Sequence, residues 1–181
     1  MKKQTKCKRT QRYYSASAFL SSYVKSLNLI VDKQPFLSII LTSCGIEYLG
    51  KCLSSSKTWD QSGLSQIDYE KAINELDAFK EYRAWLKPYS LYISLRCSPV
   101  HSLAPSSKLK FVNIGKNSED AGVLIISAKQ YLKDFSKAVE SFRHDKKSGG
   151  KSVEKPIIIV TDEGPTSLTA ITPDYPSTYQ K

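Results

Sequence analysis

Apolar residues recur every three or four positions along much of the first hundred residues, which is the spacing of amphipathic helices. This pattern predicts helices over 14–31, 35–53, 68–86 and 88–97, with Asp68 as the N-cap of the third. The stretch 35–53 is apolar on nearly every side, as expected for the central helix of a bundle. Pro99 is expected to end the fourth helix, because proline disfavours helical geometry in the residue before it.

The pattern changes after residue 107, where short β-prone runs replace the helical spacing. Residues 109–114 and 123–126 are predicted to pair as a β-hairpin. Ser127 and Gln130 match a capping box, in which Ser127 caps a last helix and Gln130 reaches back. That helix is predicted to run to about His144, with one apolar face made of Tyr131, Leu132, Phe135, Ala138, Val139 and Phe142.

These elements give a mainly α fold of about five helices, with a small β-hairpin inserted before the last helix. The predicted organisation is a basic arm over 1–12, a helical domain over 13–145 with its hairpin at about 109–126, and a linker, strand and Ser/Thr/Pro-rich tail over 146–181. The run 156–160 is strongly β-prone. An exposed strand of this kind favours aggregation, so it is expected to pair with the hairpin edge.

The chain is basic, with a formal net charge of +10 over 181 residues. Such a charge favours nucleic acid, anionic lipid or an acidic partner. The first twelve residues hold no acid and contribute six of the basic side chains: Lys2, Lys3, Lys6, Lys8, Arg9 and Arg12. We interpret these six as candidate RNA-binding residues, while a disordered start to the chain explains the same composition.

Cysteine usage and hydropathy point to a cytoplasmic protein. None of the four cysteines forms a C-x-x-C pair, and the two histidines complete no zinc pattern, so neither a metal nor another cofactor is expected. The basic start is not followed by the apolar core of a signal peptide. The most apolar stretch, 36–46, is shorter than the roughly twenty residues of a membrane span, and no membrane association is expected.

One motif carries candidate chemistry. Arg96 and His101 are separated by four residues at the end of the predicted fourth helix. This spacing and the order of the elements around it resemble the R-x4-6-H signature of HEPN domains, small helical bundles found in bacterial toxin–antitoxin and abortive-infection systems. The resemblance covers residues 14–145 and includes Arg96 and His101 as candidate site residues.

The resemblance implies a metal-independent endoribonuclease that acts as a homodimer, with RNA as substrate. Histidine can act as general acid or base at neutral pH. An arginine can stabilise the extra charge of a pentavalent phosphate with two parallel hydrogen bonds. Residues five apart on a continuous helix point about 140° apart, so a break at Pro99 is expected to let His101 fold back beside Arg96.

Two other functions remain open at this point. Cys97 follows Arg96 where active members of the family often have a polar residue, so the chain fits equally a non-catalytic module that binds RNA, a nucleotide or a protein partner such as an antitoxin. In that case Arg96 is a helix C-cap and His101 a structural loop residue. The third interpretation is an interaction protein of a bacterial defence system, without a role on nucleic acid.

Overall fold

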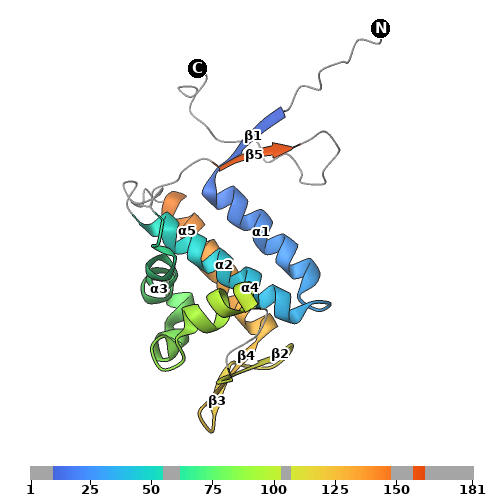
Figure 1. Cartoon of the computed structure of the whole chain (residues 1–181). Coiled ribbons are helices and arrows are strands. Elements are labelled where there is room, and N and C mark those ends of the chain that lie inside the picture. The colour runs from blue at the N-terminus through green and yellow to red at the C-terminus, as the bar shows by residue number, and fades with distance from the viewer. Residues whose placement is uncertain (1–9, 55–61, 103–106, 148–156, 162–181) are drawn as a thin grey trace.

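The computed structural model describes residues 10–54, 62–102, 107–147 and 157–161, and its main body is helical (Figure 1). The predicted fold class is confirmed, since helices dominate and a small sheet precedes the last one. The elements of the helical body are α1 Ala16–Ile30, α2 Pro35–Leu53, α3 Ser65–Glu75, the 3-10 helix η2 Asp77–Trp85, the π-helix η3 Ile93–Cys97, α4 Ser98–Ser102 and α5 Ala128–Lys147.

Helix α2 lies at the centre and packs against α1, α3, α5 and η3. Its bounds are those predicted from the sequence. Close approach to α3 depends on Gly50, because a Cβ atom there would lie 1.7 Å from the backbone oxygen of Asp68. By length and composition α2 is also the one helix, among the described residues, that could cross a membrane. More than half of that window is buried inside the protein, as in the core helix of a bundle.

The predicted third helix is wrong in its start and its continuity. Leu76 has extended backbone angles of φ −99° and ψ 126°, and it separates α3 from η2. Asp68 is not the N-cap but lies within α3, where its buried carboxylate accepts a hydrogen bond of 3.0 Å from Ser54 Oγ. The carboxylate therefore ties the end of α2 to α3.

The predicted helix end at Pro99 is also wrong, because residues 91–102 are helical throughout. The turn before Pro99 is a π-turn, in which the Ser98 N–H donates to the Ile93 carbonyl. Proline within a helix lacks one hydrogen-bond donor and collides with the carbonyl four residues earlier. The wider π-turn relieves this conflict and places Pro99 in the first turn of α4, where proline is tolerated.

A three-stranded sheet lies between α4 and α5, in the order β2-β4-β3. Its strands are β2 Leu109–Val112, β3 Ser118–Asp120 and β4 Val123–Ser127. The predicted hairpin between the first and last of these runs is wrong, since β2 and β4 are parallel. The antiparallel hairpin joins β3 to β4 through Ala121 and Gly122, which both have positive φ. Two such residues form the tight turn that suits a hairpin.

The predicted capping box at the start of α5 is half correct. The Gln130 backbone N–H donates to Ser127 Oγ at 3.4 Å, so Ser127 caps the helix. The Gln130 side chain points forward instead and donates to the carboxylate of Asp134. All six apolar residues predicted for the inner face of α5 are buried.

The strand near the C-terminus exists as β5 Ile157–Thr161, but its predicted partner is wrong. It pairs antiparallel with β1 Thr10–Tyr14, so that Thr10 lies opposite Thr161. This two-stranded sheet and the three-stranded sheet lie at opposite ends of the helical body (Figure 1). Residues 10–12 of the predicted basic arm therefore belong to a strand.

Candidate functional site

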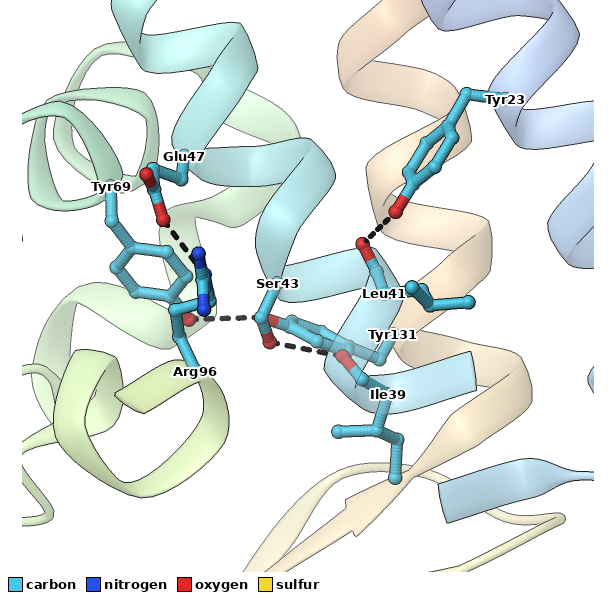
Figure 2. Close-up of polar contacts among 8 residues, drawn as sticks. All are labelled: Tyr23, Ile39, Leu41, Ser43, Glu47, Tyr69, Arg96 and Tyr131. Atoms are coloured by element: carbon cyan, nitrogen blue, oxygen red, sulfur yellow. Dashed lines mark hydrogen bonds and ion pairs between the residues drawn. The ribbon is translucent and has the colours of Figure 1, made fainter. Parts of the chain in front are cut away.

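Arg96 of η3 forms an ion pair with Glu47 of α2 (Figure 2). The Arg96 Nε donates to Glu47 Oε2 at 2.8 Å, and the two side chains are 23% and 19% exposed. Both charges are thus largely removed from water but still reach the surface. Arg96 is not the helix C-cap considered above, because the helical segment continues beyond it to residue 102.

The surroundings of this pair keep Arg96 charged. Burial lowers the pKa of the guanidinium, but the neighbouring Cys44 and Glu47 outweigh this effect and raise the pKa above its usual value. In turn, burial raises the pKa of the Cys44 thiol, although Arg96 acts in the opposite direction. An arginine that stays charged at every physiological pH can bind a phosphate oxygen through its remaining N–H donors.

His101 lies in α4 and its side chain is exposed. It follows Arg96 on one continuous helical segment, so the expected fold-back at Pro99 does not occur. The Arg96 side chain is directed at Glu47 of α2, whereas the His101 side chain is exposed. The structure therefore places one predicted site residue against α2 and the other at the surface.

Exposed apolar side chains flank the same segment. Ile93 is 47% exposed and Val100 is 42% exposed. They lie on one continuous helical segment, Ile93 at the start of η3 and Val100 within α4. Leu37 in the first turn of α2 is a further exposed apolar residue.

A second polar cluster lies inside the bundle, and sequence reasoning treated its members only as core residues. Ser43 Oγ donates to the Ile39 carbonyl at 3.0 Å and lies 3.1 Å from the Tyr131 hydroxyl (Figure 2). The Tyr69 hydroxyl lies 2.9 Å from that of Tyr131. Either atom of each hydroxyl pair can donate, and with the Ser43 proton on the carbonyl the contacts fit the order Tyr69 to Tyr131 to Ser43 to the carbonyl.

A related set of contacts fixes the β insert to the helices. The Tyr82 hydroxyl donates to the buried Asp134 carboxylate at 2.9 Å and accepts from Asn117 Nδ2. Asn117 Oδ1 in turn accepts from the Ser127 backbone N–H at 2.8 Å. Burial raises the pKa of Tyr82 well above its usual value, with Asp134 adding to the effect. These contacts hold the insert in place and are structural.

The other predicted site residues fall mostly outside the described part of the chain. This applies to Lys2, Lys3, Lys6, Lys8 and Arg9, whereas Arg12 belongs to β1. Within the described ranges no group of three or more His, Cys, Asp or Glu side chains could hold a metal ion. Sequence reasoning missed Glu47, although one signal was present: it is the only acidic residue between positions 35 and 53.

Neither the protein-family models, nor the curated proteins, nor the solved structures with which the chain was compared gave a match. The case for a function therefore depends on the residues and contacts above.

Proposed function

We propose that the protein is an RNA-cleaving enzyme of HEPN type that needs no metal. The observation that carries this proposal is a charged, partly exposed Arg96 on the same helical segment as an exposed His101. Arg96 stabilises the phosphate as its negative charge grows, and His101 takes or gives the proton. The net charge of +10 supports an anionic substrate.

The proposed active form is a homodimer. In one chain Arg96 is paired with Glu47 of α2, while His101 is exposed. In the proposed dimer, two copies pack through this helical segment, and the arginine of one copy meets the histidine of the other. The exposed apolar side chains of Ile93 and Val100 support such packing.

The test is incubation of the purified protein with a mixed RNA pool in EDTA. Wild type is expected to cleave, and His101→Ala to lose about a hundredfold or more of that activity, because it lacks the proton carrier. His144→Ala, at an exposed position of α5, is the matched control and is expected to cleave as wild type does. Cleavage that survives both Arg96→Ala and His101→Ala would rule out this active site.

A second candidate is a non-catalytic module that binds RNA or a protein partner such as an antitoxin. The Arg96–Glu47 ion pair favours it, because an arginine already held by a carboxylate serves to join α2 to η3. This candidate predicts salt-sensitive RNA retention without cleavage. Deletion of residues 1–9, which removes five basic side chains and spares strand β1, is then expected to weaken retention.

A further inference from the structure

Glu47 is a costly residue at its position. It is the only acid of α2, in a helix whose other side chains are mostly apolar and mostly buried. A largely desolvated ion pair is often no more stabilising than two well-packed apolar side chains. The ion pair joins α2 to η3, but stability alone is a weak reason for a carboxylate at this position.

The carboxylate also competes with any anion for the same guanidinium. It holds Arg96 Nε at 2.8 Å and neutralises the charge that a phosphate would meet. Both side chains are about one-fifth exposed, so an incoming phosphate can reach the pair from the surface. Because like charges repel at short range, a phosphate on Arg96 and an ionised Glu47 oppose each other.

We infer that Glu47 is a latch on Arg96: it holds Nε and neutralises the guanidinium in the resting protein, so an RNA phosphate binds Arg96 tightly only after Glu47 has let go. This inference rests on the proposed function and adds regulation of the same site. Glu47 acts through Arg96 and is not itself a catalytic residue. The latch lowers RNA affinity in the resting protein, and whatever separates α2 from η3 increases it.

The experiment measures binding of a fluorescein-labelled oligouridylate of about twenty nucleotides over a range of salt concentrations. Glu47→Gln keeps an acceptor for Arg96 Nε but removes the negative charge. It is expected to bind about fivefold more tightly than wild type near 50 mM salt. The slope of log affinity against log salt is expected to become steeper by about 0.7, the value of one added phosphate contact on a single strand.

Two further variants make the result specific. Glu75→Gln removes one negative charge from α3, where Glu75 pairs with Lys71 at 3.8 Å, and is expected to leave the salt slope unchanged. The double variant Glu47→Gln/Arg96→Ala is expected to lose the whole gain. A merely structural role of Glu47 would not change the salt slope through Arg96.

The outcomes separate the latch from the function on which it rests. If Arg96→Ala weakens binding while Glu47→Gln leaves it unchanged or weaker, Glu47 is no latch, and the proposed function stands. If Glu47→Gln/Arg96→Ala binds as tightly as Glu47→Gln, or if neither wild type nor Glu47→Gln binds RNA, both inferences are wrong. A circular-dichroism melt of each variant confirms that it is folded.

Discussion

Helix α2 makes two polar contacts that differ in kind, four residues apart. Ser43 faces inward and belongs to a chain of hydroxyls that ends on a backbone carbonyl, entirely within the core. Glu47 lies nearer the surface and binds a charged group that solvent still reaches. In the first contact every donor has an acceptor, and nothing remains for a ligand. In the second, a charge is held where an anion can compete for it.

The two contacts show how a polar group that stabilises a helical bundle differs from one that can bind a ligand. A neutral hydrogen-bonded chain in the core gives a small net stabilisation and is costly to interrupt, since its members cannot turn to water. An ion pair at the rim gives little stability but leaves a charge available for exchange. Substitutions in the hydroxyl chain are therefore expected to change stability, whereas substitutions in the ion pair are expected to change the binding of an anion.

The largest expected effect on stability comes from high pH, through the buried tyrosines. Burial raises the pKa of Tyr69, Tyr82 and Tyr131 above the usual 10.0. Above that value the unfolded chain releases protons that the folded protein retains, so stability is complete below pH 10 and falls as pH rises. The fall is expected to approach about 1.4 kcal/mol per pH unit for each tyrosine, and urea unfolding at a series of alkaline pH values measures it.

The next effect tests the direction of the hydroxyl chain. Tyr131→Phe leaves the Tyr69 hydroxyl without an acceptor and is expected to cost about 1–3 kcal/mol of unfolding free energy. Tyr69→Phe removes only the first donor and is expected to cost less than about 1 kcal/mol. Urea unfolding of both variants is the measurement. Equal costs would show that the order of donors is different.

The smallest expected effect on stability comes from the ion pair between Glu47 and Arg96, which lies near the surface. Glu47→Gln is expected to lower the unfolding free energy by about 1 kcal/mol or less, because the pair is partly solvated and the amide oxygen still accepts from Arg96. The same urea titration measures it beside Tyr131→Phe. A loss of several kcal/mol would place the ion pair with the structural contacts and weaken the contrast.

Local periodicity predicted α1, α2 and α5 well, whereas the third and fourth helices and the pairing of strands were predicted wrongly in part. The apolar face of α5 and the bounds of α2 follow from the spacing of apolar residues, because that spacing matches the repeat of an α-helix. The partner of a strand depends on which strands come together in the folded protein, and the local sequence does not determine this. For that reason β5 was assigned to the wrong sheet. The rule that a proline ends a helix failed at Pro99, because a π-turn accommodates the proline within the helical segment.

The candidate site was predicted only in part. Arg96 and His101 stand out in the sequence, but their relative direction depends on whether the helix continues between them. The partner of Arg96 lies forty-nine positions away and is set by the packing of η3 on α2. No spacing rule reveals that contact, although a lone acid in an apolar helix is a sign that a buried charge needs a partner.

The most direct test compares a variant of Arg96, in the ion pair, with a variant of Tyr131, in the buried hydroxyl chain, in the same two assays. RNA cleavage in EDTA and urea unfolding are measured for wild type, Arg96→Lys and Tyr131→Phe. The account predicts that Arg96→Lys loses most of the cleavage and keeps its stability, because lysine retains the charge but not the planar pair of donors. Tyr131→Phe is expected to lose stability and keep cleavage. Full cleavage by Arg96→Lys, or equal losses of cleavage in both variants, would contradict it.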